Sequence, residues 1–144
     1  MKPASPFESY RKIATQTATP GQLVLMLYDG AIKFLNQARQ GFECEDPLDF
    51  NLTINNNLQR AQAIIQELNS SLDMKAGGEV SQNFRRLYTY MEDRLHDANV
   101  KKEQEGIEDV INRITVLRDA WAEMLSQNDD ANPSAALASL AVSG

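Results

Sequence analysis

Two residue types that build catalytic and metal sites are nearly absent from this chain. Its 144 residues include one histidine, His96, and one cysteine, Cys44. A lone cysteine excludes an internal disulfide and fits a reducing compartment. Cys44 lies in an acidic loop, where nearby carboxylates disfavour the reactive thiolate, so we expect no nucleophilic role. Asp93-x-x-His96 matches half of a di-metal bundle motif, but a second histidine is missing, so we expect no metal site.

Signature motifs, long hydrophobic runs and basic clusters are missing as well. The chain has no GxxxxGKS, GxxxxGKT or GxSxG motif, so we expect neither an enzyme nor a cofactor. Its longest unbroken apolar run, 23–28, is too short to span a membrane, and its start does not resemble a secretory signal. A net charge of -6 and scattered Lys and Arg residues argue against nucleic acid as a partner. We therefore expect a cytoplasmic protein that binds no nucleic acid and does not insert into a membrane.

What the chain does contain is helical periodicity. Apolar residues recur at alternating spacings of four and three along four segments. Thr19, Pro20 and Gln22 form a capping-box start for the first segment, and Asp46-Pro47 starts the second. The four predicted helices cover residues 20–41, 47–72, 80–99 and 107–124. Short connections make neighbouring helices antiparallel, so we predict an all-α, antiparallel up-down four-helix bundle.

Both ends of the chain differ from its middle. We predict an N-terminal capping segment, a bundle domain and a disordered tail, at residues 1–17, 18–127 and 128–144. Phe7, Tyr10 and Ile13 share one side of a short amphipathic helix that is too short to be stable alone. This helix either docks permanently and completes the core, or acts as a removable lid over the first long helix. The sequence leaves both interpretations open.

The first long helix carries more apolar surface than one buried face requires. Its seam follows the helical spacing through Val24, Tyr28, Ala31, Leu35, Ala38 and Phe42. Further apolar positions lie outside that seam: Leu23, Leu25, Met26, Leu27, Ile32 and Phe34. The second helix has one outlier, Ile64. A helix that is apolar nearly all round is either central in its fold or partly reserved for another chain. We interpret the surplus as a surface for a partner, with self-pairing in a homo-oligomeric structural bundle as the alternative.

The run Tyr28-Asp29-Gly30 supports two interpretations. Glycine within a helix costs about 1 kcal/mol relative to alanine, so Gly30 must have a compensating role. One interpretation is a close helix approach at Gly30, with Tyr28 a core residue whose hydroxyl is bonded and Asp29 pairing locally. The other is a binding site. For Tyr88 and Trp121 we favour core aromatics with bonded polar atoms.

Several of these stretches together resemble the flagellin export chaperone family, FliS. The similarity runs from Tyr10 to Ala38, centred on TPGQLVLMLYDGAIKFLNQA, and continues through LYTYMEDRLHDAN at 87–99 and VLRDAW at 116–121. One departure is Glu103, where such proteins often carry an aspartate helix cap. The resemblance implies an antiparallel four-helix bundle with a short N-terminal helix. It also implies a cytoplasmic chaperone that binds the C-terminal segment of flagellin, prevents premature polymerisation and delivers flagellin to the type III export gate.

The same resemblance implies where the partner binds. The N-terminal helix would cover the flagellin groove, which makes Phe7, Tyr10 and Ile13 the lid. The apolar residues predicted to line the groove are Leu23, Met26, Ile32, Leu58 and Ile65. Asp29 and Asn56 are predicted to set the register of the bound segment, and Tyr28 is also predicted to contact it. Contact with the export gate would come through the flagellin complex, and a regulator or co-chaperone and a weak homodimer stay open. A related type III secretion co-chaperone is a further alternative.

Overall fold

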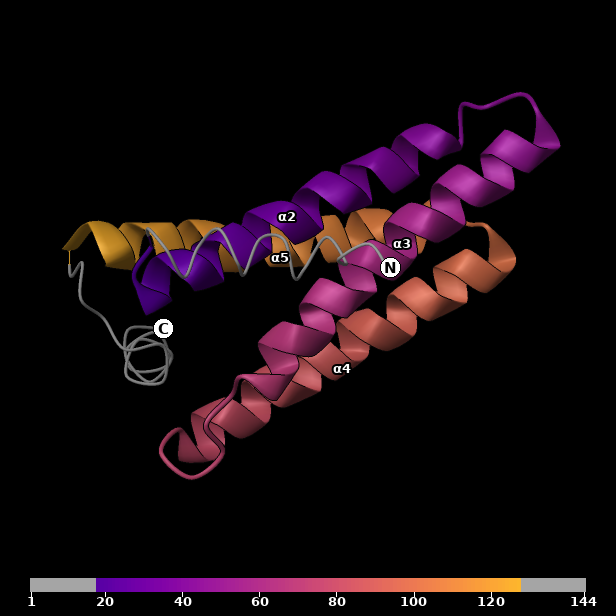
Figure 1. Ribbon diagram of the computed structural model, residues 1–144. Helices are drawn as coiled ribbons and strands as arrows, with labels where there is room; N and C mark the ends of the chain where they lie inside the picture. Colours follow the sequence, from indigo (N-terminus) through magenta and orange to yellow (C-terminus); the bar gives the residue numbers. More distant parts are fainter. Residues whose placement is uncertain (1–17, 128–144) are drawn as a thin grey trace, which may run out of the picture.

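The computed structural model describes residues 18–127, and every regular element in that range is an α-helix (Figure 1). The helices are α2 (Pro20–Gly41), α3 (Pro47–Ser70), α4 (Gly78–Lys101) and α5 (Gln104–Gln127). The predicted all-α, four-helix architecture is therefore confirmed. The predicted N-terminal helix and C-terminal tail lie outside the described residues.

The starts of α2 and α3 follow the predicted capping signals. Thr19 accepts a hydrogen bond from the Gln22 backbone at 3.2 Å, and the Gln22 side chain accepts one from the Thr19 backbone at 3.1 Å. Asp46 caps α3 by accepting from the Asp49 backbone at 3.0 Å. These bonds, reciprocal at Thr19 and single at Asp46, satisfy amide groups that have no partner within the helix, so the local sequence is sufficient to set both starts.

The connection between α4 and α5 is shorter than the interval of 100–106 left between the predicted helices 80–99 and 107–124. Helix α4 continues to Lys101 and α5 begins at Gln104, which leaves only Lys102 and Glu103 between them. Lys102 has a left-handed backbone with φ of 53°, and the Glu103 amide donates to the Ala98 carbonyl at 3.1 Å. This is the bonding pattern of a Schellman helix end, usually built on glycine. The prediction was wrong here because a lysine occupies the left-handed position.

The four helices form a closed ring in which each packs against two others. Helix α2 packs against α3 and α5, and α4 packs against the same two helices (Figure 1). Consecutive helices run antiparallel, as short connections require. Ile64, which falls outside the four-and-three spacing of its helix, is fully buried. A helix that contacts two neighbours buries a wider arc than a single seam, and Ile64 lies within that arc.

Candidate partner-binding surface

Helix α2 exposes less apolar surface than its sequence predicts, but part of that surface is still accessible. Leu27 and Phe34, both assigned to the surplus, are buried at 4% and 6% exposure because α2 lies between α3 and α5. Four other surplus side chains are only half-buried: Leu23, Leu25, Met26 and Ile32. Three of these four, Leu23, Leu25 and Met26, lie in the first two turns of the helix, and Ile32 follows in its second half.

One flank of α2 meets α5 and is joined to it by a charged contact. Leu25, Asp29 and Ile32 share this flank by their spacing of four and three. The Arg118 Nε of α5 donates to the Asp29 Oδ1 at 2.7 Å. Local pairing of Asp29, which belonged to one of the two interpretations, is wrong, since its partner comes from the last helix. Half-exposed ion pairs contribute little to stability, so we expect this contact to add little to the packing of α2 against α5.

The other flank of α2 is apolar and borders α3. Leu23, Met26 and Gly30 share it by their spacing of three and four. We call Leu23 and Met26 the α2 apolar flank. Cations lie further along this side of the helix: Lys33 Nζ and the Arg60 guanidinium carbon of α3 are 5.9 Å and 5.7 Å from the Phe34 ring centroid. An amphipathic segment with carboxylates beyond its apolar face would match this order of apolar and basic groups.

Beneath α2, three aromatic residues join the helices across the bundle. The Tyr28 and Tyr88 hydroxyls of α2 and α4 are hydrogen-bonded at 2.6 Å, and both side chains are buried. The Trp121 Nε1 of α5 donates to the Gly21 carbonyl at 2.8 Å, and its ring meets Tyr28 edge-on. Burial raises the pKa of Tyr28 to about 12 and raises that of Tyr88 well above 10. The predicted core aromatics with bonded polar atoms are confirmed.

The remaining predicted site residues are distributed between core and surface. Leu58 and Ile65 of α3 have no exposed surface, whereas Asn56 is exposed. Tyr28 is equally enclosed, so a partner could reach these three buried residues only by opening the bundle. Phe7, Tyr10 and Ile13 lie outside the described residues, and their assignment as a lid stays a prediction. Among the predicted site residues, Leu23 and Met26 therefore share one flank of α2, and Asp29 and Ile32 share the opposite flank.

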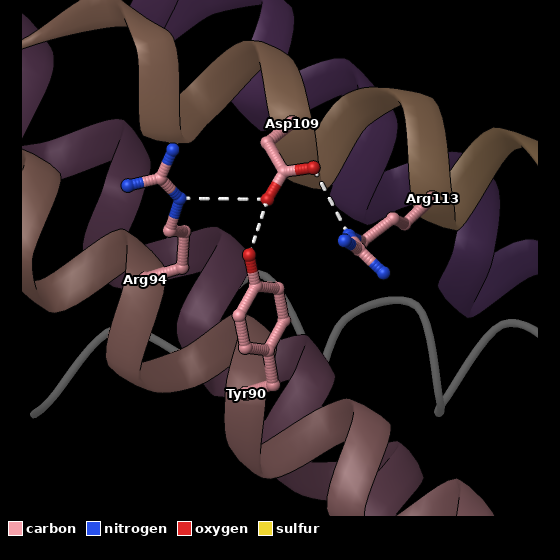
Figure 2. Close-up of polar contacts among 4 residues, drawn as sticks. All are labelled: Tyr90, Arg94, Asp109 and Arg113. Carbon is pink, nitrogen blue, oxygen red and sulfur yellow. Dashed lines mark hydrogen bonds and ion pairs between the residues drawn. The ribbon is translucent and has the colours of Figure 1, made fainter.

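Sequence reasoning did not identify a polar cluster that joins α4 to α5. Figure 2 shows Tyr90 and Arg94 of α4 converging with Arg113 on Asp109 of α5. The Asp109 carboxylate accepts from the Tyr90 hydroxyl at 2.7 Å, from Arg113 Nε at 3.0 Å and from Arg94 Nε at 3.4 Å. The Arg113 guanidinium also lies 4.7 Å from the Tyr90 ring centroid. The Tyr90 hydroxyl, followed by the arginines, lowers the pKa of Asp109.

This cluster links α4 to α5, because one carboxylate accepts hydrogen bonds from three side chains on the two helices. One of its contacts could have been predicted from the sequence, because Arg113 follows Asp109 by four residues on the same helix. The contacts from α4 depend on the helix register and carry no signal in the sequence. Within residues 18–127, no group of three or more metal-ligating side chains comes together. None of the described helices has the length and apolar content needed to cross a membrane.

Comparison with known proteins gives a consistent family assignment. The family model described as flagellar protein FliS matches residues 3–128. The flagellar secretion chaperone FliS of Bacillus subtilis is 38% identical over 135 residues, which cover 93% of this chain and 97% of the relative. The proteins of the same name from Salmonella typhimurium and Vibrio cholerae are 33% and 30% identical, covering 86% and 81% of this chain and 93% and 86% of the relatives. The chain therefore belongs to the FliS family of flagellar secretion chaperones.

Proposed function

We propose that this protein is a cytoplasmic export chaperone that binds the C-terminal segment of flagellin, prevents its premature polymerisation and delivers it to the flagellar type III export apparatus. Family membership supports the flagellar role. The observation that supports binding is the α2 apolar flank, where Leu23 and Met26 keep exposed area beside the closed core. The relatives are named chaperones, which agrees with a role that needs no catalytic group.

The proposed mechanism is coupled folding and binding. A disordered terminal segment would become helical as its apolar face covers the α2 apolar flank. Such interactions typically bury roughly 1,000–3,000 Å² and spend about 2–5 kcal/mol or more on ordering the segment. Burial contributes about 25 cal/mol per Å², so much of the gross gain is offset by lost chain entropy. The complex can therefore be specific and still release its cargo at the export gate.

The half-buried state of the flank favours this mechanism. A fully enclosed side chain would have to leave the core before a partner could touch it, which costs the bundle its packing. Leu23 and Met26 can gain burial from a partner without disturbing the Tyr28–Tyr88 bond or the Trp121 contact below. Lys33 and Arg60 supply positive charge beside the same flank, where carboxylates of the bound segment could pair.

Calorimetric titration with a peptide of the last segment of flagellin tests the proposal. We expect heat of binding at micromolar concentrations and at least a tenfold loss of affinity in the Leu23→Gln/Met26→Gln variant. Val116→Gln is the matched control, because Val116 is 68% exposed on α5, away from this flank. Thermal melting should show that the double variant remains folded. Absence of heat with the unaltered protein would eliminate flagellin as cargo, and a stable dimer unaffected by the peptide would favour the homo-oligomeric bundle.

The lid assignment has its own test. Deleting residues 1–16 should increase the association rate of the flagellin peptide if Phe7, Tyr10 and Ile13 cover the groove. Stopped-flow fluorescence of Trp121, the only tryptophan in the chain, can follow the reaction. An unchanged or slower association rate would show that the segment is structural or part of the binding site.

A further inference from the structure

Three large apolar side chains at one end of the bundle keep about half or more of their surface exposed. Leu48 and Leu52 in the first turns of α3 are 64% and 47% exposed, and Val100 in the last turn of α4 is 69% exposed. Leu48 and Leu52 are four residues apart, so they lie on one face of α3. Apolar residues exposed singly need no explanation, whereas a group of them indicates an interaction site.

Two contacts between α3 and α4 bring these residues to the same part of the surface. The Asn99 side chain donates to the Asn55 side chain at 2.9 Å, and the Gln62 side chain donates to the Glu92 carbonyl at 3.3 Å. Both contacts fit one antiparallel register. In that register Val100 lies level with the turn of α3 that carries Leu52. We call Leu48, Leu52 and Val100 the α3–α4 end patch.

The charges around the α3–α4 end patch are acidic. The segment from 43 to 49 contains Glu43, Glu45, Asp46 and Asp49, and no lysine or arginine occurs between Arg39 and Arg60. The lysines at the end of α4 are already engaged. Lys101 pairs with Asp97 at 3.1 Å, and Lys102 Nζ donates to the Asn99 carbonyl at 2.8 Å. The patch therefore combines exposed apolar area with uncompensated negative charge on one side.

We propose that the α3–α4 end patch docks a basic amphipathic helix of a second protein partner. Two leucines one turn apart, with a valine on the adjacent helix, offer a contact for apolar residues spaced three and four apart. Lysines or arginines flanking that apolar stripe would meet Glu43, Glu45 and Asp49, which favours fast association that weakens with salt. Three apolar side chains make a small contact, so the interaction belongs to the transient class.

The position of the patch separates it from the proposed flagellin surface. Helix α2 has 22 residues and is about 33 Å long, and Leu23 and Met26 lie at its beginning. The α3–α4 end patch lies at the end of the bundle where α2 ends, α3 begins and α4 ends (Figure 1). A second partner could therefore occupy this end while the first half of α2 holds cargo.

Binding of a designed probe tests the proposal. The probe is a fluorescently labelled helical peptide made of leucine and lysine, with leucines spaced three and four apart, and the comparison peptide has glutamate in place of every lysine. Fluorescence anisotropy with the full chain should show binding of the lysine peptide only. The Leu48→Gln/Leu52→Gln/Val100→Gln variant should weaken it at least tenfold. The control Val116→Gln should stay within twofold, because Val116 is as exposed as Val100 but lies on α5.

Further variants and measurements test which kind of molecule binds the α3–α4 end patch. Glu43→Gln/Glu45→Gln should weaken the lysine peptide several-fold and reduce its salt dependence, while Asp46 is left intact because it caps α3. The triple variant should bind the flagellin peptide as the unaltered protein does. Equal affinity of the unaltered protein for the lysine and glutamate peptides would overturn the proposal. So would an affinity for the lysine peptide that is the same in the unaltered protein and in the patch variants. A self-association lost in the triple variant would identify a second copy as occupant, and a parallel loss of flagellin affinity would assign the patch to the cargo site; either result overturns it.

Discussion

At the residue scale, the buried polar atoms determine how the helices are joined. The Tyr28 and Tyr88 hydroxyls satisfy each other across the ring of helices, and Trp121 is satisfied by the Gly21 carbonyl. Each of these atoms would otherwise lose its bond to water on burial, which costs more than the bond contributes when it is made. The aromatic residues therefore select one arrangement of α2, α4 and α5 as well as filling space.

The tyrosine pair predicts a non-additive double-mutant cycle. Tyr28→Phe and Tyr88→Phe should each lower the free energy of unfolding by about 1–2 kcal/mol, because each leaves the other hydroxyl buried without its partner. The double variant should lose about 1 kcal/mol less than the sum of the single variants. Urea titrations followed by circular dichroism measure all three. Strict additivity would show that the 2.6 Å contact contributes nothing of its own.

Among the described residues, Asn57 of α3 is the exception to this pairing of buried polar side-chain atoms. Its Nδ2 donates to the Thr53 carbonyl at 2.8 Å, but its buried Oδ1 has no hydrogen-bond partner. Asn57→Leu removes that unsatisfied atom and should raise the free energy of unfolding by about 1 kcal/mol. The control Asn112→Leu is on the exposed face of α5 and should change it by less than about 0.5 kcal/mol. A lower melting temperature for Asn57→Leu would contradict this account.

At the element scale, local capping signals set where a helix starts, whereas contacts between helices depend on how the helices pack. Capping at Thr19 and Asp46 is local, and it was predictable because the bonded atoms are three residues apart. The Asp109 cluster between α4 and α5 was not predictable, because Tyr90 and Arg94 reach it only when the two helices pack in one register (Figure 2). The same holds for Asp29, whose partner Arg118 is on the last helix.

The Asp109 cluster predicts a pH dependence of stability. Its pKa is lowered in the folded protein, so the carboxylate stabilises the fold above its unfolded pKa of about 3.9. That contribution is lost as the pH falls through the folded pKa. Asp109→Asn should therefore be less stable than the unaltered protein at pH 7, and the difference should shrink below about pH 4. Urea midpoints at pH 7 and pH 3 measure this, and a gap that widens in acid would refute it.

At the scale of the whole molecule, one core joins all four described helices. Fully enclosed side chains come from each of them, including Leu35, Ile65, Leu95 and Trp121. Because every helix packs against two others, no helix can leave without exposing core side chains of its neighbours. The α2 apolar flank is thus presented on a rigid support, which lowers the ordering cost on the chaperone side of the complex.

The shared core predicts cooperative unfolding of the bundle. Trp121 emission should shift to longer wavelength as its enclosed ring becomes exposed, and the far-ultraviolet circular dichroism should be lost in the same urea range. Coincident midpoints would show that α2 and α5 unfold together with the rest of the bundle. Transitions that separate would show that one pair of helices is an independent unit.

The sequence alone determined the all-α architecture and the starts of α2 and α3. Periodicity and local hydrogen bonds depend on residues three or four apart, so Thr19, Asp46 and the all-α architecture could be predicted directly. Only the tertiary structure decided which apolar side chains are enclosed. Leu27 and Leu23 have the same chemistry, yet one is 4% exposed and the other half-buried. Burial is a property of the neighbours that surround a side chain, and α3 and α5 reach only part of α2.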